Sequence, residues 1–195
     1  MTIKIYRDDW QYAIPFLTIL AFFISTDLLK VINKIDLAYI SGALPYQIYR
    51  SFTSHFVHGN FGHLLANTFG IVVARYFFKQ LSLKFNYLFL LLVLLIIPLH
   101  SFFQWLFDTY VLHNSHSVLI GFSGIIYAVY AFIFLSSIYG KKYFLGINID
   151  LLSDFNVFRS MRILILIGFL WSLLPNISFS GHLTGFIIGL ILFLA

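Results

Sequence analysis

Six long apolar stretches, separated by polar connections, make up most of this chain. A helix needs roughly 20 apolar residues to cross the hydrocarbon core of a bilayer, and each stretch reaches or approaches that length. The predicted spans cover residues 12–32, 62–78, 85–107, 122–139, 161–174 and 181–195. No low-complexity tract, repeat or linker separates them. The sequence therefore predicts an all-α membrane protein in which residues 1–195 form one domain, a bundle of six transmembrane helices.

The scarcity of charge excludes several classes of protein. Only 10% of the residues are charged, whereas a soluble domain carries about 25%. Such a chain cannot cover a water-facing surface, which excludes a soluble enzyme, a nucleic-acid-binding protein and a disordered chain. The net charge of +5 comes from lysines and arginines at the ends of apolar stretches, a pattern typical of membrane topology. Because the sequence has no cysteine, thiol nucleophiles and disulfides are also excluded.

The basic residues predict how the chain is oriented. Nine of the twelve lie in the N-terminal tail and in the second and fourth connections: Lys4, Arg7, Arg75, Lys79, Lys84, Lys141, Lys142, Arg159 and Arg162. The other three, Lys30, Lys34 and Arg50, lie in or beside the first connection. Because cytoplasmic connections carry the excess of lysine and arginine, both termini are predicted to be cytoplasmic. The first connection, residues 33–61, is long and rich in aromatic residues, so we expect it to be membrane-associated in the outer interface.

Polar side chains inside the predicted spans are the candidates for function, because burying them in lipid is costly. They form three groups, each with its neighbours: His58, His63 and Asn67 at the second span; Gly121, Ser123, Gly124 and Tyr127 at the fourth; and His182, Gly185 and Gly189 at the sixth. Each feature alone is common in ordinary helix packing. Their occurrence together indicates a site.

The residue types of these groups suit hydrolysis by a serine nucleophile. A serine hydroxyl is a weak nucleophile until a base removes its proton, and His182 is the one histidine of the last two spans. Ser123 begins a helix, so its backbone N–H can face a developing oxyanion, and His63 and Asn67 can add side-chain donors. Tyr127 lies one turn along and can stack on the imidazole.

The glycines of the fourth and sixth spans allow these groups to meet. Gly121 and Gly124 leave room for a substrate carbonyl and for a close helix neighbour. Gly185 and Gly189 form a Gly-x-x-x-Gly face that lets the last helix approach the fourth, which brings the histidine to the serine.

The residues present in the sequence argue against other intramembrane functions. An intramembrane metalloprotease needs His-Glu-x-x-His, and the chain has no glutamate. An aspartyl protease needs two aspartates within spans, whereas all seven lie at span ends or in connections. A small transporter needs paired charges along its pathway. The pairs His55/His58 and His113/His116 lack carboxylate partners, so no metal site is predicted, and His55, His100, His113 and His116 are interpreted as structural or solvent-facing.

Four motifs, taken together, resemble those of rhomboid intramembrane serine proteases of bacterial type. They are Tyr49-Arg50 in the first connection, the His-x4-His-x3-Asn pattern of His58, His63 and Asn67, Gly121-Phe122-Ser123-Gly124, and His182-Leu183-Thr184-Gly185. The resemblance extends from about residue 49 to 189. Tyr49 stands where the family usually has tryptophan, and the subfamily stays open, including the rhombosortase-like branch.

The resemblance implies a catalytic dyad without an acidic third member. Ser123 would be the nucleophile and His182 the general base, while His63, Asn67 and the backbone N–H of Ser123 would form the oxyanion hole. No cofactor or metal is implied.

The resemblance also implies supporting roles and a substrate class. His58 would bond the loop, and Arg50 would brace the first connection. Substrates would be membrane-anchored helices, cut in or near the outer leaflet of a bacterial or archaeal inner membrane, with the fifth helix moving to admit them. The alternative is a catalytically inactive rhomboid-like protein that binds membrane clients. The oligomeric state is left open.

Overall fold

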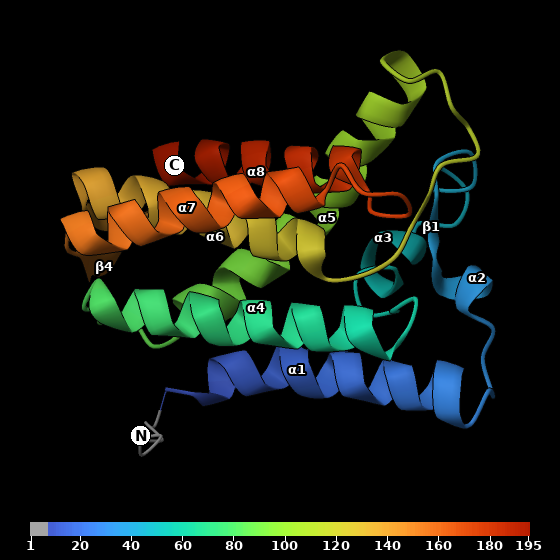
Figure 1. Ribbon diagram of the computed structural model, residues 1–195, viewed down its shortest axis with the longest axis horizontal. Coiled ribbons are helices and arrows are strands. Elements are labelled where there is room, and N and C mark those ends of the chain that lie inside the picture. The colour runs from blue at the N-terminus through green and yellow to red at the C-terminus, as the bar shows by residue number, and fades with distance from the viewer. Residues whose placement is uncertain (1–7) are drawn as a thin grey trace.

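The computed structural model describes residues 8–195, so Lys4 and Arg7, which were counted for the topology, lie outside the described residues. Most of the described chain is helical (Figure 1). The long helical elements are α1 (Trp10–Phe23) with its π-helical continuation η1 (Ile24–Leu28), α4 (Phe61–Gln80), α5 (Leu88–Tyr110), α6 (Ser123–Tyr139), α7 (Phe155–Trp171) and α8 (Phe179–Leu194). Two single-turn helices, α2 (Lys34–Leu37) and α3 (Arg50–Thr53), lie in the first connection.

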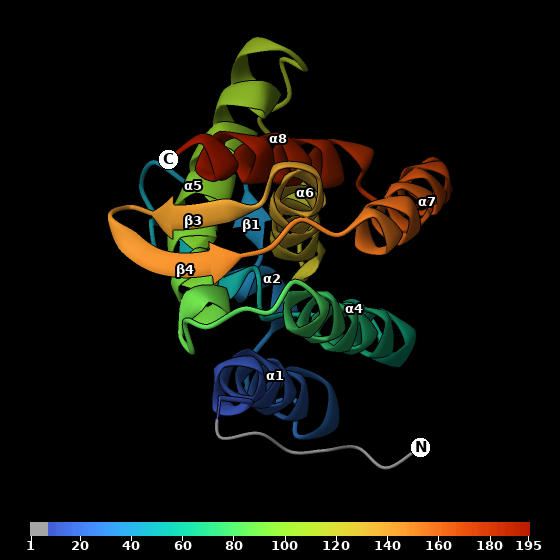
Figure 2. The same ribbon diagram turned by 90° about the vertical axis from the view of Figure 1, so that its left-hand side faces the viewer.

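Helix α6 is the centre of the bundle. It contacts α4, α5, α7 and α8, and Figure 2, which looks along the bundle, shows these four helices around it. Its side chains explain this position, because Ile125, Ile126, Ala128 and Ala131 lie on different sides of the helix and are all buried. A helix that is apolar all round belongs in a core. Helices α1, α4, α6, α7 and α8 run along the long axis, while α5 crosses obliquely (Figure 1).

Helix α7 starts six residues before the predicted fifth span. The side chain of Asp154 accepts hydrogen bonds from the backbone N–H groups of Asn156 and Val157, and a cap of this kind fixes a helix start. The prediction that Arg159 and Arg162 belong to a connection is therefore wrong, because both lie in the first turns of α7.

The other predicted spans shift less. The first helix ends at Leu28 instead of residue 32, because Lys30 has a positive φ of 53° and turns the chain away. The third span covers Leu88–Tyr110 instead of 85–107, and the sixth begins at Phe179, behind a serine cap at Ser178.

Two connections contain short strands that the sequence analysis did not predict. Strands β3 (Lys141–Phe144) and β4 (Ile147–Leu151) form an antiparallel hairpin between α6 and α7. Its two turn residues, Leu145 and Gly146, both have positive φ, as a tight hairpin turn requires. Strands β1 (Tyr39–Ile40) and β2 (Val118–Leu119) pair the first connection with the third.

Helix length alone supports fewer spans than the six predicted. Within residues 8–195, two helices are long and apolar enough to cross a bilayer: Trp10–Leu28, which joins α1 and η1, and α5. Helices α6 and α8 are apolar but have 17 and 16 residues. The six-span topology therefore stays a prediction.

Ion pairs gather at one end of the bundle, where α1 begins and α4 ends. They are Arg75–Asp9, Lys79–Asp8 and Lys84–Asp150. The Nε atom of Arg75 lies 2.7 Å from a carboxylate oxygen of Asp9. At the same end, the ammonium of Lys141 donates to the carbonyl oxygen of Phe193, near the end of α8. Helices α4, α6 and α8 begin at the opposite end of the bundle (Figure 1). The basic residues therefore lie at the end away from the serine motif.

Candidate active site

A serine and a histidine that are 59 residues apart in sequence meet where α6 and α8 begin. The Oγ atom of Ser123, the first residue of α6, lies 2.8 Å from Nε2 of His182 on α8. The imidazole is buried and the serine is half-buried. This is a normal hydrogen-bond distance, within the reach that a general base needs.

Direct backbone contact between α6 and α8 makes this meeting possible. A Cβ atom placed on Gly185 would lie 2.1 Å from the carbonyl oxygen of Gly124, and one on Gly189 would lie 2.0 Å from that of Ala128. No side chain fits at either position. The predicted Gly-x-x-x-Gly face therefore lies against α6.

The ring of Tyr127, one turn after Ser123, lies flat against the imidazole of His182. The ring centroids are 4.2 Å apart and the planes differ by 8°. On its far side, the Tyr127 hydroxyl lies so close to α7 that a Cβ atom at Gly168 would come within 2.5 Å of it. The stack fixes the plane in which the imidazole nitrogens lie.

A second serine contacts the histidine, and the sequence analysis missed it. Ser172 directly follows α7 as its C-cap, is buried, and has its Oγ 2.5 Å from Nδ1 of His182. In the sequence it stands between Trp171 and Leu173, with no glycine, histidine or motif beside it. No local pattern could have singled it out, because its contact depends on how α7 lies beside α8.

Hydrogen-bond donors gather on the other side of Ser123, around Gly121. Gly121 has a φ of +111°, and a Cβ there would lie 2.5 Å from the ring of His63 and 3.4 Å from Nδ2 of Asn67. Within the described chain, this Nδ2 is buried without a hydrogen-bond partner. The backbone N–H of Ser123 is also free of helix partners, because the first N–H groups of a helix have none. His63 and Asn67 thus lie where the sequence predicted, beside the turn into the serine.

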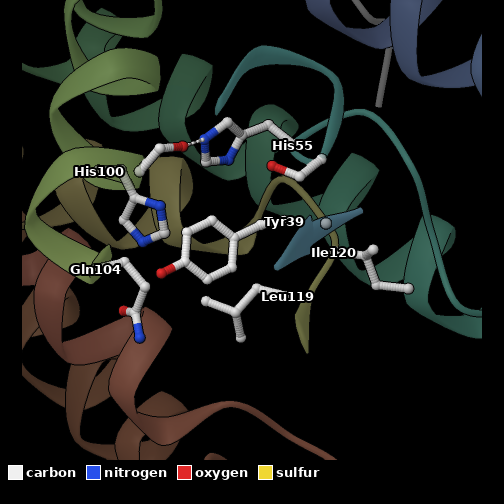
Figure 3. A pocket seen from close by; sticks show the side chains of 9 residues that line it. Tyr39, His55, His100, Gln104, Leu119 and Ile120 are labelled. Carbon is white, nitrogen blue, oxygen red and sulfur yellow. Dashed lines mark hydrogen bonds between the residues drawn. The ribbon is translucent and has the colours of Figure 1, made fainter. Parts of the chain in front are cut away.

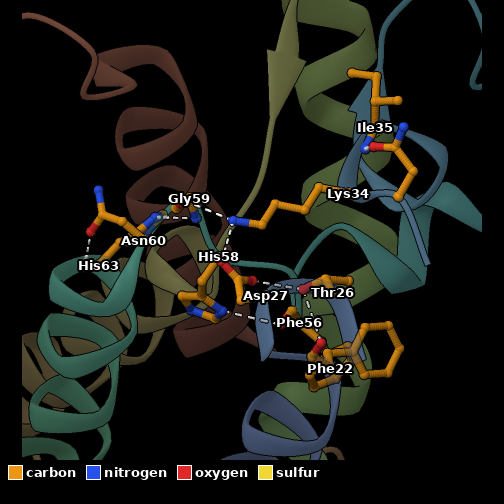
Figure 4. A network of polar contacts seen from close by, with 11 residues as sticks. Phe22, Thr26, Asp27, Lys34, Ile35, Phe56, His58, Gly59, Asn60 and His63 are labelled. Atoms are coloured by element: carbon orange, nitrogen blue, oxygen red, sulfur yellow. Dashed lines mark hydrogen bonds and ion pairs between the residues drawn. The ribbon is translucent and has the colours of Figure 1, made fainter. Parts of the chain in front are cut away.

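The tautomer of His63 follows from its loop contact. The backbone N–H of Gly59 donates to Nδ1 of His63 at 3.4 Å, so the ring proton is on Nε2, which faces Gly121. The carbonyl of Gly59 accepts a 2.9 Å hydrogen bond from Lys34, which also pairs with Asp27 at the end of η1 (Figure 4). An ion pair in the first connection thus supports a donor beside the serine motif.

His58 bonds the loop in which it lies, as the resemblance implied. Its Nδ1 is 3.0 Å from the carbonyl oxygen of Phe56 (Figure 4), and its ring packs edge-on against that of His63, with centroids 5.0 Å apart. Burial, together with the nearby ring of His63, lowers the pKa of His58 to about 4. His58 is therefore neutral near pH 7.

Arg50 holds the first connection together through its buried guanidinium. Its Nη1 donates to the carbonyl oxygens of Ile35 and Ala38 at 2.6 and 2.7 Å, and its Nε donates to the side chain of Gln47 at 2.5 Å. All of these contacts lie within the first connection. Arg50 therefore shapes this connection.

A small cavity of about 20 Å³, shown in Figure 3, is bordered by Gly121. Its lining comes from the first connection, from α5 and from the chain before α6: Tyr39, Ser54, His55, His100, Ser101, Gln104, Leu119, Ile120 and Gly121. The cavity volume is sufficient for about one water molecule.

The remaining histidines divide between core and surface. His100 is buried, with Nε2 2.8 Å from the carbonyl oxygen of Gly181, and a Cβ on Gly124 would lie 2.3 Å from that nitrogen. Gly124 therefore makes room for His100 as well as for α8. Burial lowers the pKa of His55 to about 3, so it is neutral near pH 7. His113 and His116 are exposed, and within residues 8–195 no three His or Asp side chains gather as a metal site requires.

Fold and site together define a helical protein with a buried serine–histidine pair beside a group of hydrogen-bond donors. The sequence matches the family model of the Rhomboid domain over residues 45–195, so the chain belongs to the rhomboid family. This is a family of intramembrane proteases that act on membrane proteins within the bilayer, and the chain is accordingly a helical integral membrane protein. The comparison with curated proteins finds no match.

Proposed function

We propose that this protein is an intramembrane serine endopeptidase in which Ser123 and His182 form a catalytic dyad. The observation that carries the proposal is the 2.8 Å contact between Ser123 Oγ and His182 Nε2. A nucleophile within hydrogen-bond reach of a base, with that base oriented by further groups, is the arrangement that acyl transfer requires.

The reaction follows from these positions. Ser123 Oγ attacks the scissile carbonyl carbon while His182 Nε2 takes the hydroxyl proton. The imidazolium then gives this proton to the leaving amine, which breaks the C–N bond and leaves an acyl-enzyme. Water, deprotonated by the same nitrogen, attacks the ester and releases the acid and the free serine.

The oxyanion formed in each step needs donors that are already in place. The backbone N–H of Ser123, Nε2–H of His63 and Nδ2 of Asn67 border the turn at Gly121. The unpartnered Nδ2 supports this role, because a buried donor without an acceptor is unfavourable by about 1–3 kcal/mol in the resting protein. An oxyanion would supply the missing acceptor.

The distribution of charge supports a six-span topology with both termini in the cytoplasm. Lys79, Lys84, Lys141 and Lys142 lie at one end of the bundle, and basic residues favour the cytoplasmic side. The dyad then lies toward the outer leaflet of a bacterial or archaeal inner membrane.

The first connection fits the outer interface of that membrane. Its side chains Tyr46 and Ile48 are 89% and 79% exposed, which is unfavourable in water and favourable among lipid headgroups and acyl chains. Substrates are membrane-anchored helices. Their scissile bond must leave its helix to reach Ser123, because a helical carbonyl is already hydrogen-bonded.

The alternative function within the same family is that of a catalytically inactive protein that binds membrane clients. It is less well supported, since both dyad residues are present and their side chains are within hydrogen-bonding distance.

A serine-reactive fluorophosphonate probe tests the proposal directly. We expect the purified protein in detergent to be labelled at Ser123, because only a hydroxyl activated by a base reacts quickly with such a probe. Labelling is measured by in-gel fluorescence and by mass spectrometry of the modified peptide. The Ser123→Ala protein serves as the control and should stay unlabelled. Equal labelling of the two proteins would contradict the proposal.

Removing side-chain donors should slow turnover without ending it. We expect His63→Ala and Asn67→Ala each to lower kcat by about 10²-fold, the usual loss for one oxyanion-hole donor, with a smaller change in KM. The measurement is cleavage of a fluorogenic transmembrane substrate in liposomes. Asn60, whose side chain caps α4 at the N–H of His63, offers a control. Asn60→Asp keeps this cap and should retain most of the activity. Wild-type kcat in both alanine variants would remove these residues from the oxyanion hole.

A further inference from the structure

The contact between Ser172 and His182 is not explained by a two-residue dyad. Ser172 Oγ is 2.5 Å from Nδ1, the ring nitrogen that faces away from Ser123. The two serines come from different helices, α7 and α6, and contact the two nitrogens of one imidazole. The hydrogen-bond arrangement at Ser172 determines which nitrogen carries the ring proton.

A serine hydroxyl has one proton to donate, and at Ser172 it is already used. The hydroxyl donates to the carbonyl oxygen of Gly168, four residues earlier in α7, at 2.7 Å. Its oxygen is therefore an acceptor toward His182, and Nδ1 must carry the proton that it accepts. The hydroxyl of Tyr127, 3.2 Å from the same oxygen, can then donate to it as well.

We propose that Ser172 is a positioning residue that holds His182 in the tautomer with Nδ1 protonated and the Nε2 lone pair directed at Ser123. The inference rests on the proposed function of the dyad. The opposite tautomer would present a proton to Ser123 and could not accept one. Ser172 thus does with a neutral hydroxyl what an aspartate does in a triad, where the third group fixes the tautomer of the base.

The surroundings of the imidazole leave this task to Ser172. In the described part of the chain, the side chains that hydrogen-bond to the His182 ring or stack on it are Ser123, Ser172 and Tyr127. A stacked ring fixes a plane but does not distinguish the two nitrogens. Among these groups, Ser172 alone accepts from Nδ1.

A purely structural reading exists, because a serine that bonds back to a carbonyl four residues earlier can simply satisfy the last turn of a helix. Ser136 on α6 is a matched control. It is equally buried, donates to the carbonyl oxygen of Phe132 at 2.8 Å, and makes no hydrogen bond to a histidine within the described chain. Ser136→Ala therefore removes the same type of bond without touching the dyad.

Kinetics of three variants test the inference. We expect Ser172→Ala to lower kcat about tenfold with KM unchanged, the factor expected from one ordinary hydrogen bond. Ser172→Thr keeps a hydroxyl and should restore most of kcat, and Ser136→Ala should match the wild type. The assay is cleavage of the transmembrane substrate in liposomes, with melting temperature measured in parallel.

The tautomer itself is the decisive readout, because a merely structural role would not change it. The ¹⁵N NMR spectrum of histidine-labelled protein in detergent reports whether Nδ1 or Nε2 carries the proton, and His182→Gln identifies the relevant signal. We expect the wild type and Ser172→Thr to have Nδ1 protonated, and Ser172→Ala to have a mixture of the two forms.

The outcomes separate this inference from the proposed function. Cleavage by Ser123→Ala would overturn the dyad itself. An inactive Ser123→Ala together with a Ser172→Ala of wild-type kcat and tautomer would overturn only the role of Ser172. If Ser172→Ala does not fold, the wild-type spectrum still decides, because Nε2 protonation there would contradict the inference.

Discussion

Replacing Ser123 with alanine is expected to abolish cleavage of a transmembrane substrate, lowering kcat by about 10⁴-fold or more. The hydroxyl proposed to attack the carbonyl is then absent, and His182 has no proton to accept. His182→Ala should have nearly the same effect, because the two residues act as one unit and their losses do not add. Cleavage in liposomes, followed by gel shift of the substrate, measures both variants.

The control for this experiment lies on the same helix. Ser137 is buried and donates only within α6, to the carbonyl oxygen of Phe134, so Ser137→Ala should cleave normally. The expression and melting temperature of Ser123→Ala should equal those of the wild type, because Ser123 is half-buried at the helix start. Undiminished cleavage by Ser123→Ala would exclude serine catalysis at this site.

The second large effect is expected from a single methyl group. Gly189→Ala places a Cβ 2.0 Å from the carbonyl oxygen of Ala128, so α8 must move away from α6. The neighbouring atom belongs to the backbone, which cannot move aside as the end of a flexible side chain can. We therefore expect the free energy of unfolding to fall by about 3 kcal/mol, at the upper end of typical overpacking. Cleavage should fall to background, since the separation of the helices also separates Ser123 from His182. Thermal unfolding in detergent and the cleavage assay measure the two effects.

Gly62→Ala is the matched control for this variant. The site is exposed in the first turn of α4, and the added Cβ would meet only the side-chain oxygen of Asn60, at 3.3 Å. This variant should unfold at or near the wild-type temperature. A Gly189→Ala protein with wild-type stability and activity would show that close α6–α8 contact is not needed.

The sequence predicted the helices well because hydropathy is a local property that lipid and core impose on each segment. It predicted helix ends less well. The start of α7 depends on the cap at Asp154, which hydropathy does not register, and Arg159 was therefore assigned to a connection. The hairpin of β3 and β4 was missed because Leu145-Gly146 is not one of the dipeptides typical of tight turns.

The residues of the candidate site also differ in whether the sequence alone indicated them. Ser123, His63, Asn67 and His182 were found because each lies in a short pattern of polar residues and glycines within an apolar stretch. Ser172 was not found, because its neighbours in the sequence are ordinary apolar residues and its partner lies on another helix. A contact between two helices leaves no recognisable pattern in the sequence of either helix.

The two serines at the imidazole are held in place by different helix contacts. Ser123 and His182 are joined through the backbone contact of α6 with α8, whereas Ser172 belongs to α7, whose buried side chains Val157, Met161 and Ile165 all lie in its first eleven residues. A displacement of the end of α7 that carries Ser172 would leave that contact, and so the nucleophile beside its base, in place. The imidazole would then lose the acceptor at Nδ1, and proton exchange with solvent could convert it to the form protonated on Nε2. In that form the imidazole could not accept the proton of Ser123, so the proposed hydrolysis would require α7 to be in place.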